Sequence, residues 1–575
     1  MTKLQLLCAV FFGILRMSYS EEVDGFKLTV LHTNDIHAHF EESNKYGGRC
    51  ELSDKKKKKC VGGVARLLTK VKEIKASNNH TLFMNAGDIY QGTMWFTLLK
   101  DEVVSVVMAN MKYDVMCLGN HEFDNGPEGL APFLKKMKKA KVPVVSSNTD
   151  FTRTSSLKDL ELPKSHVFVL NGTKVGVIGA VTPETRSLSK PGNVVFYDDL
   201  GSIRNEAINL TKQGITVIVA LTHSGYERDL EIAASVPQVD IVVGGHTNTF
   251  LYSGEGYPRE NKPEGPYPTV VNRTDGSVAL VTQDFWFGKF LGFLEVIFDT
   301  QGRVKSWSGN PILMDSSIEE DECMVRVLRP FAEKIANASK TRVGSSKVLL
   351  EQDNNVCRIQ ECNLGNAIAD SFFEYYANEE TQDKELWSNV NGAFVNGGST
   401  RAPLPQSDNI LYQDILNALP FGSQLTVLSL TGTKLREIFE HSVKTYSLTA
   451  RPGRFLQVSG IRVTYNLSRE SGSRVQSLKI LGTRCKVPVY EDVSNESTYS
   501  VVTIDYIAKG GDGFPIDASV NSTTKGVVDY EAFVDYVRKM SPLKTPEEGR
   551  IEIVGMPPEA RVLHDPDRWG VTYEI

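Results

Sequence analysis

The sequence predicts an α/β protein in which a helix joins a layered α/β sandwich to an α+β domain. Over roughly the first 300 residues, short apolar segments rich in β-branched residues alternate with helix-like segments, as in α/β layer architectures. A long amphipathic segment follows, and the remainder mixes helices and strands without regular alternation. The length of 575 residues also requires more than one core, because single cores stop growing near ~250–300 residues.

The composition is that of an ordinary globular protein, with 41% hydrophobic and 23% charged residues. A net charge of −6 and a pI of about 6.0 argue against a nucleic-acid partner, which would require a basic surface. Mean hydropathy is −0.22, and beyond residue 20 no apolar run approaches the ~18 residues that span a bilayer.

Both ends of the chain predict an exported protein. Residues 1–20 resemble a signal peptide, with Lys3 before an apolar stretch and Ser18 and Ser20 at a small-residue cleavage site. Residues 554–575 lack the hydrophobic tail of ~10–20 residues that a glycolipid anchor signal needs, so we expect no membrane anchor. Eight Asn-x-Ser/Thr sequons fit a secreted, extracellular glycoprotein. They begin at Asn79, Asn171, Asn209, Asn272, Asn337, Asn466, Asn495 and Asn521.

Seven cysteines remain after the expected cleavage, and export favours disulfides. Cys357 and Cys362 are close enough in sequence to close a small loop, and so are Cys50 and Cys60. The odd number leaves at least one thiol unpaired, and Cys117 lies in an apolar run where we expect a buried, free thiol. The sequence leaves open whether Cys323 pairs with Cys485.

We assign residues 21–317 to the α/β sandwich. The expected strands are residues 26–31, 81–85, 114–118, 175–181, 216–221 and 240–243. Residues 63–75 and 127–141 have helical patterns, and the second opens with a proline in its first turn. The lysine run 55–59 predicts a solvated hairpin tip; the alternative is a patch for acidic polysaccharides or membrane surfaces.

Residues 318–340 are expected to form the linker helix. Apolar side chains recur there at helical spacing, and Pro330 should kink or break the helix. Residues 341–553 form the expected α+β domain, with helices at 364–376 and 433–446 and strands such as 425–430 and 499–504.

Polar side chains gather where five expected strands end. The segments are Asp35-Ile-His37, Gly87-Asp88, Gly119-Asn120-His121-Glu122-Phe123-Asp124, His223-Ser-Gly225 and Gly245-His246-Thr-Asn248. In α/β sheets, ligands bind outside the carboxyl ends of the strands. A mixed Asp, His and Asn set suits a divalent metal such as Zn²⁺, Mn²⁺ or Fe²⁺ better than a thiolate site would.

In this order the segments resemble the metallophosphoesterase motifs, and Leu31-His-Thr-Asn-Asp-Ile-His37 with Gly119-Asn-His-Glu-Phe-Asp124 resembles the 5′-nucleotidase/apyrase family. The second half is similar to that family too. Its matching strings are Cys357-Arg-Ile-Gln-Glu-Cys362, Asn396-Gly-Gly-Ser-Thr-Arg401, Leu419-Pro-Phe421-Gly and Lys509-Gly-Gly-Asp512-Gly-Phe514. The resemblance implies a four-layer metallophosphoesterase sandwich and a C-terminal nucleotide-binding domain.

The resemblance also implies roles for individual residues. Two divalent ions are expected, with zinc the first choice and Mg²⁺, Ca²⁺ or Mn²⁺ as alternatives. The implied metal ligands are Asp35 and His37 with Asn248 near one ion, Asn120, His223 and His246 at the other, and Asp88 between them. His121, oriented by Asp124, would be catalytic by donating a hydrogen bond to the phosphoryl or leaving oxygen.

The expected substrate-binding residues all follow residue 350. Arg358 and Arg401 suit phosphate, Phe421 and Tyr506 suit stacking on a purine, and Asp512, together with Asn396, suits hydrogen bonds to a ribose or base.

Two residues depart from the family pattern. His39 stands where members of the family often carry an arginine, which weakens one expected phosphate contact. Gly482 stands where vertebrate members place a cysteine, so Cys485 lacks that partner.

The leading functional prediction is a secreted apyrase that removes phosphate from ATP and ADP. Without an anchor signal, the chain resembles the salivary apyrases of blood-feeding arthropods, which implies inhibition of platelet aggregation in a host. The main alternative is a 5′-nucleotidase that converts AMP to adenosine, and a cyclic-nucleotide or UDP-sugar hydrolase would use the same chemistry. A remote alternative is an inactive nucleotide scavenger or platelet-receptor ligand. Base preference and oligomeric state are left open.

Overall fold

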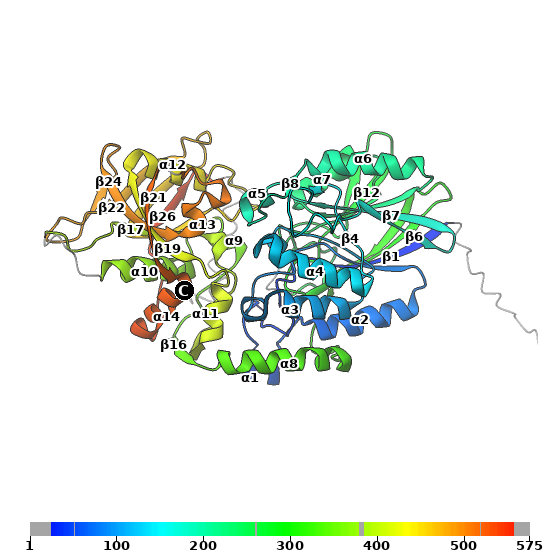
Figure 1. Cartoon of the computed structure of the whole chain (residues 1–575), viewed down its shortest axis with the longest axis horizontal. Coiled ribbons are helices and arrows are strands. Elements are labelled where there is room, and N and C mark those ends of the chain that lie inside the picture. Colours follow the sequence, from blue (N-terminus) through cyan, green and yellow to red (C-terminus); the bar gives the residue numbers. More distant parts are fainter. Residues whose placement is uncertain are drawn as a thin grey trace, which may run out of the picture.

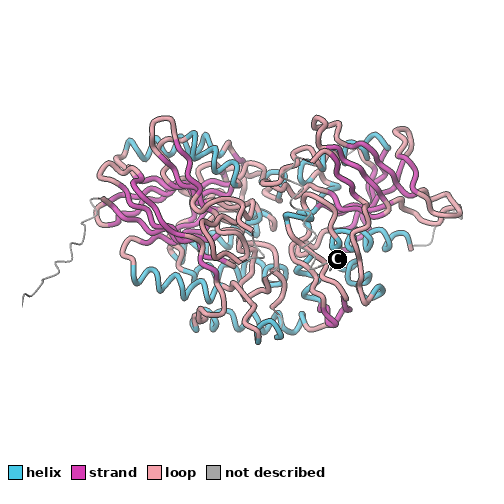
Figure 2. The backbone as a smooth tube through the Cα atoms, turned by 180° about the vertical axis from the view of Figure 1, so that it is seen from behind, coloured by secondary structure: helices cyan, strands magenta, loops and turns pink. Residues whose placement is uncertain are grey.

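The computed structural model describes residues 25–45, 47–50, 52–258, 262–378, 385–517 and 519–556. The expected signal peptide, residues 1–20, lies outside the described residues, as do residues 557–575 of the expected tail. Two bodies lie side by side, and helix α8 (Glu322–Ser339) runs beneath them as the connection (Figures 1 and 2).

Two β-sheets form the centre of the first body. In the first sheet the strands are ordered β14 (Val304–Gly309), β13 (Phe290–Phe298), β1 (Phe26–Thr33), β2 (Thr81–Asn85), β3 (Val115–Cys117) and β4 (Val144–Val145), and β15 (Ile312–Leu313) pairs with β13. In the second sheet they are ordered β11 (Thr269–Asn272), β12 (Val278–Thr282), β10 (Ile241–Val243), β9 (Val217–His223), β7 (Thr173–Val181) and β6 (Ser165–Leu170).

The two sheets pack face to face between outer helices, which gives four layers. The alternating side chains of β1 explain this, because Leu28 and Val30 face the second sheet while Leu31 faces the helices. Helices α2 (Val64–Ser77), α3 (Met94–Met111) and α4 (Gly126–Ala140) cover the first sheet. Helices α6 (Asp199–Lys212) and α7 (Tyr226–Ser235) cover the second. The predicted α/β sandwich is confirmed.

The strands that precede the polar segments run parallel within their sheets. In the first sheet β1 pairs in parallel with β2, and β2 with β3. In the second sheet β9 pairs in parallel with both β7 and β10. Their carboxyl ends therefore lie at one edge of each sheet, as the sequence predicts.

Helix α8 is continuous from Glu322 to Ser339, so the break expected at Pro330 is wrong. Met324, Leu328, Phe331 and Ile335 are buried against the first body, as their spacing predicts. Pro330 is exposed, so water can bond the carbonyl that lacks its helical N–H partner.

The second body is the expected α+β domain around a single core. Its largest sheet is ordered β20 (Leu456–Ser459), β17 (Gly392–Asn396), β24 (Thr498–Ile504), β19 (Gln424–Thr431) and β25 (Asn521–Val528). A second sheet is ordered β23 (Tyr490–Asp492), β22 (Val475–Leu481), β21 (Ile461–Asn466) and β26 (Ile551–Val554), and β16 (Arg342–Ser346) pairs with β18 (Ser407–Leu411). The larger helices are α10 (Asn363–Ala377), α11 (Tyr412–Ala418), α12 (Gly432–Ser442) and α14 (Asp529–Met540).

Cys50–Cys60 and Cys357–Cys362 form disulfides, while Cys117 is buried and free. Cys323 and Cys485 are also free, so they do not pair with each other. The lysine run is solvent-exposed as predicted, but it begins inside a short helix, α1 (Leu52–Lys56), rather than at a hairpin tip. Among the described residues, no helix combines the length and apolar character needed to cross a bilayer.

Candidate active site at the domain interface

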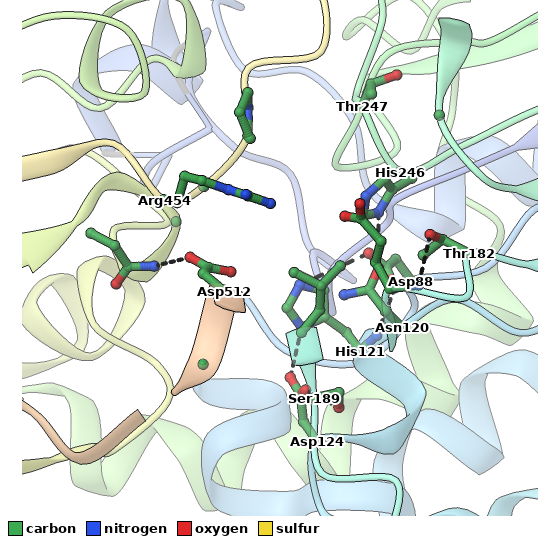
Figure 3. A pocket seen from close by; sticks show the side chains of 18 of the residues that line it. Asp88, Asn120, His121, Asp124, Thr182, Ser189, His246, Thr247, Arg454 and Asp512 are labelled. Atoms are coloured by element: carbon green, nitrogen blue, oxygen red, sulfur yellow. Dashed lines mark hydrogen bonds and ion pairs between the residues drawn. The ribbon is translucent and has the colours of Figure 1, made fainter. Parts of the chain in front are cut away.

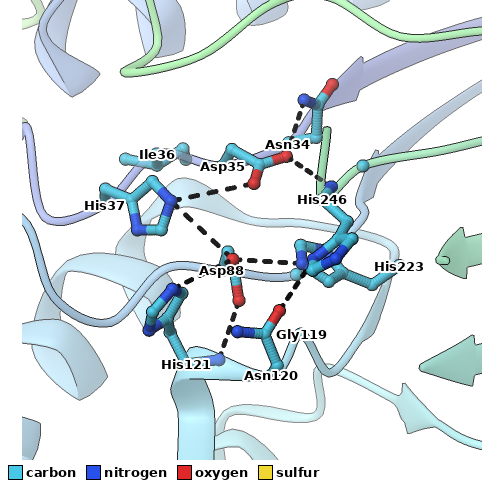
Figure 4. A network of polar contacts seen from close by, with 12 residues as sticks. Asn34, Asp35, Ile36, His37, Asp88, Gly119, Asn120, His121, His223 and His246 are labelled. Atoms are coloured by element: carbon cyan, nitrogen blue, oxygen red, sulfur yellow. Dashed lines mark hydrogen bonds and ion pairs between the residues drawn. The ribbon is translucent and has the colours of Figure 1, made fainter. Parts of the chain in front are cut away.

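The polar segments from five strand ends meet in one buried cluster (Figure 4). Asp35 and His37 follow β1, Asp88 follows β2, and Asn120 follows β3. His223 ends β9, and His246 and Asn248 follow β10. Polar contacts join six of the seven predicted metal ligands, and the seventh, Asn248, lines the same cavity as Asp88.

Asp88 stands at the centre of this cluster. Its Oδ2 atom lies 3.0 Å from Nε2 of His223 and 3.7 Å from Nε2 of His37. Its Oδ1 atom accepts a hydrogen bond from the backbone N–H of His121 at 2.9 Å. The same oxygen, Oδ2, thus faces the imidazoles of both His223 and His37, which fits a ligand shared by two ions.

The remaining oxygens and nitrogens converge on the same space. Nδ1 of His246 lies 2.9 Å from Oδ1 of Asn120, and the backbone N–H of His246 donates to Oδ2 of Asp35 at 2.9 Å. Oδ1 of Asp35 and Oδ1 of Asn248 are buried and accept no hydrogen bond from the described residues. Buried oxygens without a donor, beside imidazole nitrogens, fit divalent cations.

Most of these side chains sit on unusual backbone. The φ angles are 49° at Asp35, 48° at His37, 54° at Asp88, 80° at His246 and 56° at Asn248. Left-handed backbone is uncommon for residues other than glycine and costs of order 1–3 kcal/mol each at functional sites. The surrounding fold keeps these residues in the left-handed conformation. That backbone conformation directs their side chains back into the cluster.

Two glycines let the strand ends approach closely. A Cβ atom on Gly119 would lie 2.2 Å from Oδ1 of Asp88. A Cβ atom on Gly245 would lie 2.9 Å from Nδ1 of His223 and 3.1 Å from Oδ2 of Asp35. Any larger residue at either position would push the ligand cluster apart.

The titration of the cluster reflects a balance between burial and charge. Burial and the nearby guanidinium of Arg401 hold the pKa of His37 well below its usual value. Burial also lowers the pKa of His246 to about 3. Burial would also lower the pKa of His223, but the carboxylates of Asp88 and Asp35 outweigh this effect and raise the pKa to about 10. His37 and His246 therefore favour the neutral form that binds metals, whereas His223 is charged beside the two carboxylates and would have to lose its proton to bind a metal ion.

His121 lies at the rim of the cluster and belongs to a hydrogen-bonded chain. Its Nδ1 atom lies 2.6 Å from Oδ2 of Asp124, and the hydroxyl of Ser189 donates to Oδ1 of Asp124 at 2.6 Å. Burial would lower the pKa of His121, but the carboxylates of Asp124 and Asp88 reverse this and raise it. The predicted His121–Asp124 pair is thus present, and Ser189 is an addition that the sequence analysis missed.

The second domain reaches this cluster through Arg401. Its Nη2 atom donates to Nε2 of His37 at 2.8 Å, and its guanidinium carbon lies 5.9 Å from the ring centre of Phe421. The Phe421 ring lies 5.8 Å from the ring of His121. Arg358 lines the same cavity, and its Nε is buried without a hydrogen-bond partner.

Asp512 is held in place by two other predicted substrate residues. Asn396 donates to Oδ2 of Asp512 at 2.7 Å, and the hydroxyl of Tyr506 donates to Oδ1 at 2.9 Å. Tyr506 was predicted only to stack on a purine. The contact between its hydroxyl and Asp512 is a feature that only the structure reveals.

Both domains line one cavity of about 930 Å³ (Figure 3). His37, Asp88 and His121 face it from the first domain, and Arg358 and Phe421 face it from the second. Polar contacts join the domains around it. Oδ1 of Asp414 accepts from Nε of Arg49 at 2.9 Å, and Oε2 of Glu264 accepts from Nη2 of Arg451 at 2.7 Å.

Glu122 is a structural residue of the site, and the sequence alone assigned it no role. Its buried carboxylate accepts backbone N–H groups of Asp88 at 2.9 Å, Ile89 at 2.8 Å, Tyr90 at 3.1 Å and Gly119 at 2.5 Å. It therefore ties the loop after β2 to the loop after β3. Its place inside the Gly-Asn-His-Glu string was the available signal.

The two departures from the family pattern also have structural outcomes. The His39 ring stacks on Phe287 with ring centres 3.7 Å apart, and Nδ1 bonds the carbonyl of His37 at 2.8 Å. His39 is not among the residues that line the cavity. Cys485 lies beside Gly482, with its Sγ 3.1 Å from the Gly482 carbonyl oxygen.

Comparison with known proteins agrees with this architecture in both halves. Residues 28–250 match the family model for calcineurin-like phosphoesterases, and residues 342–518 match that for the 5′-nucleotidase C-terminal domain. The chain belongs to the 5′-nucleotidase family. It is 40% identical to a snake venom 5′-nucleotidase of Crotalus adamanteus, over 95% of this chain and 92% of that protein.

Two further 5′-nucleotidase relatives cover nearly the whole chain. The 5′-nucleotidase of Homo sapiens is 40% identical over 92% of this chain and 91% of its own length. The crystal structure of a 5′-nucleotidase precursor from Thermus thermophilus superposes with a TM-score of 0.84 at 36% identity, covering 92% of this chain and 100% of that one. The protein is therefore a metal-dependent nucleotide phosphohydrolase, and its metallophosphoesterase fold implies a dinuclear divalent metal site.

Proposed function

We propose that this 5′-nucleotidase family member hydrolyses the 5′-phosphate of a nucleoside monophosphate such as AMP. The observation that carries the proposal is the contact between Arg401 and His37, which joins the nucleotide side of the cavity to the metal-ligand cluster. Phosphate and nucleoside would therefore occupy one continuous space. The relatives named 5′-nucleotidase support the same reaction.

The proposed metal ligands are the seven residues of the cluster. Asp35, His37 and Asn248 would hold one ion, Asn120, His223 and His246 the other, and Asp88 both. When bound, a pair of divalent ions lowers the pKa of water and neutralises negative charge on a phosphoryl group. The mixed nitrogen and oxygen donors suit Zn²⁺ first, with Mg²⁺, Ca²⁺ and Mn²⁺ as alternatives.

The other residues would bind and orient the substrate. His121, held by Asp124, would donate a hydrogen bond to a phosphoryl oxygen or to the leaving oxygen. Arg401 and Arg358 would bind phosphate oxygens. Phe421 and Tyr506 would stack on the base, which is typically worth about 1–3 kcal/mol per base. Asp512, fixed by Asn396, would accept hydrogen bonds from the ribose or the base.

An apyrase acting on ATP and ADP is the second candidate, and one observation favours it. Among the described residues, the cavity contains one more unpaired arginine than the two assigned to a single phosphate, because Arg454 lines it in addition to Arg358 and Arg401. Removal of ADP by this second activity would inhibit platelet aggregation.

Secretion is also part of the proposal. The name of the snake venom relative supports it, and the sequon asparagines Asn79, Asn171, Asn209 and Asn272 are exposed. Glycan analysis of the protein secreted from a eukaryotic host tests this point, since an unglycosylated, retained protein would contradict it.

Phosphate release from AMP, ADP and ATP, measured side by side with Zn²⁺, Mg²⁺ and Ca²⁺, tests the proposed activity. We expect hydrolysis of AMP that a chelator abolishes and added metal restores. Hydrolysis of ADP and ATP without AMP would favour the apyrase. Tight nucleotide binding with no turnover under any metal would favour the inactive scavenger.

A further inference from the structure

Three arginines of the second domain face the cavity at different distances from the metal-ligand cluster. Arg401 contacts His37 directly at 2.8 Å. Arg358 lies further out, where burial and Arg401 lower its pKa to about 9 while the charges of Asp512 and Asp35 act against them. Arg454 lies near His441, whose ring bonds the backbone oxygen of Asp512 at 2.9 Å. All three arginines line the cavity that also contains Asp512.

Arg454 extends into the open space of the cavity. Figure 3 shows its side chain reaching from the second domain towards Asp88 and His246, on the opposite wall. Arg454 is half-buried, its Nε atom is buried without a hydrogen-bond partner, and no described carboxylate forms an ion pair with it. A buried guanidinium nitrogen with no acceptor is costly unless a ligand supplies one.

Three other cationic groups at the same cavity are already neutralised. Lys509 pairs with Asp505 at 2.6 Å, and Arg451 pairs with Glu264 at 2.7 Å. Arg228 contacts three carboxylates within 2.6 Å. The charge of Arg454 is therefore available to an anionic ligand in a way that these three are not.

The backbone that carries Arg454 is held on both sides. The carbonyl of Gly453 accepts the N–H of Gly398 at 2.9 Å, and the carbonyl of Phe455 accepts the N–H of Gly397 at 2.7 Å. Three residues earlier, Arg451 is tied to Glu264 of the first domain. A guanidinium on such a fixed segment loses less entropy on binding than one on a free loop.

We propose that Arg454 is a specificity-determining residue that binds a non-transferred phosphate of a nucleoside di- or triphosphate. The terminal phosphate would lie at the metal-ligand cluster beside Arg401, and the base would remain between Phe421 and Tyr506. A monophosphate has no second phosphate for Arg454 to bind. The inference rests on the proposed nucleotide hydrolysis and adds the substrate class that the site accepts.

The test compares Arg454→Gln and Arg454→Lys with the wild-type protein on AMP, ADP and ATP. A charge-assisted hydrogen bond is worth about 1.5–3 kcal/mol, which corresponds to about 10–100-fold. We therefore expect Arg454→Gln to lower the ratio of kcat/KM for ADP to that for AMP by about tenfold or more. Arg454→Lys should restore part of that ratio, because it keeps the charge without the planar fork.

The matched control is Lys509→Gln, which removes a cation from the same cavity wall that Asp505 already neutralises, and which should leave the ratio unchanged. If the wild-type protein binds ADP without hydrolysing it, the inhibition constant of ADP against AMP replaces kcat/KM and should rise by the same factor in Arg454→Gln. An equal loss of kcat/KM for AMP and ADP in both Arg454 variants overturns the inference. An unchanged ratio of kcat/KM for ADP to that for AMP also overturns it.

This outcome is separate from the test of the proposed function. A wild-type protein with no phosphate release from AMP contradicts the proposed reaction, whatever the variants do. A wild-type protein that neither hydrolyses ADP nor is inhibited by it contradicts the role of Arg454, even if AMP is a good substrate. Thermal unfolding of each variant identifies any loss of activity that comes from misfolding.

Discussion

Nη2 of Arg401 donates to Nε2 of His37 at 2.8 Å, although the two residues are 364 positions apart and belong to different domains. The imidazole nitrogen involved is the one that faces Asp35 and Asp88. A cation from the nucleotide side thus reaches the ligand cluster itself. Nδ1 of His37 bonds the Tyr90 carbonyl, so Nε2 carries the free lone pair of the ring, and Arg401 and a metal ion would compete for it. The positive charge of the guanidinium would also repel the ion.

The first prediction follows from that repulsion. Arg401→Met should bind divalent metal more tightly, by about tenfold, because one positive charge leaves the vicinity of the ions. The same variant should lose about 100-fold or more in kcat/KM for nucleotides, because a phosphate contact is gone. Calorimetric metal titration of the metal-free protein and steady-state kinetics measure the two effects. Weaker metal binding in Arg401→Met would contradict the repulsion model.

Glu122 provides a second prediction. Glu122→Ala leaves four backbone N–H donors of the ligand loops without their acceptor, and a buried unsatisfied group costs about 1–3 kcal/mol. We expect a lower melting temperature and a reduced metal content in scanning calorimetry and elemental analysis. Glu122→Gln, which keeps one acceptor oxygen, should fall between the wild-type protein and Glu122→Ala. Unchanged metal content in Glu122→Ala would show that the loops hold their shape without this carboxylate.

A third prediction concerns the chain from Ser189 through Asp124 to His121. His121→Ala should lower kcat by about 10²–10⁴-fold with metal content nearly unchanged. Asp124→Asn should lower kcat less than His121→Ala, and Ser189→Ala should lower it least. Asp124 contacts His121 directly, whereas Ser189 contacts it only through Asp124. Elemental analysis beside the kinetics is decisive here, because loss of one ion in His121→Ala would make His121 a metal ligand.

The fourth prediction separates the two aromatic residues. Phe421→Ala should raise KM for nucleotides about 5–100-fold, as expected for lost base stacking, and change hydrolysis of p-nitrophenyl phosphate little. Tyr506→Phe keeps the ring but removes the hydroxyl that holds Asp512, so KM should rise only several-fold. If Phe421→Ala impairs both substrates equally, Phe421 belongs to the structural core rather than to the base site.

The fifth prediction concerns the pH dependence of stability and involves Asp240, which does not line the cavity. Burial raises the pKa of Asp240 to about 8, although the N–H of Ile218 and the charge of Arg273 oppose the shift. Because the folded pKa exceeds the unfolded one, the stability that Asp240 contributes is complete below about pH 4 and is lost as pH rises towards 8.

Asp240→Asn removes this titration while keeping an acceptor for Ile218. The free energy of unfolding of the variant, measured relative to wild type by urea denaturation, should therefore increase between pH 4 and pH 8. A pH-independent difference would show that Asp240 titrates normally. A parallel measurement on Asp275→Asn, a fully exposed carboxylate, controls for surface charge.

Much of the site was predictable because its residues follow directly from strand patterns. A short apolar run followed by a glycine, such as residues 81–85, favours a buried strand, so Gly87-Asp88 is expected at its carboxyl end. Parallel pairing then brings Asp88 to the same edge as Asp35, without any knowledge of the loops. The buried Cys117 and the two small disulfide loops followed from equally local signals.

Other features depended on contacts that no local pattern encodes. Pro330 is tolerated within α8 because its ring is exposed, and exposure depends on how that helix packs. Helix α12 ends at Ser442 rather than at the expected residue 446, because the backbone leaves helical geometry at Val443, whose N–H bonds the Glu440 carbonyl. His39 packs on Phe287 away from the cavity, which its place two residues after a ligand did not indicate.

The sequence by itself determined the strand ends and the two-domain α/β organisation, because periodicity and chain order act over a few residues at a time, and it predicted the metal ligands through the family resemblance. The tertiary structure alone decided which distant side chains meet. Arg401 reaches His37, Tyr506 holds Asp512, and Arg454 faces the cavity without a carboxylate. The physical reason is that such pairings depend on how the domains and loops pack, and the free energy of that packing is shared among many weak contacts rather than carried by any one segment.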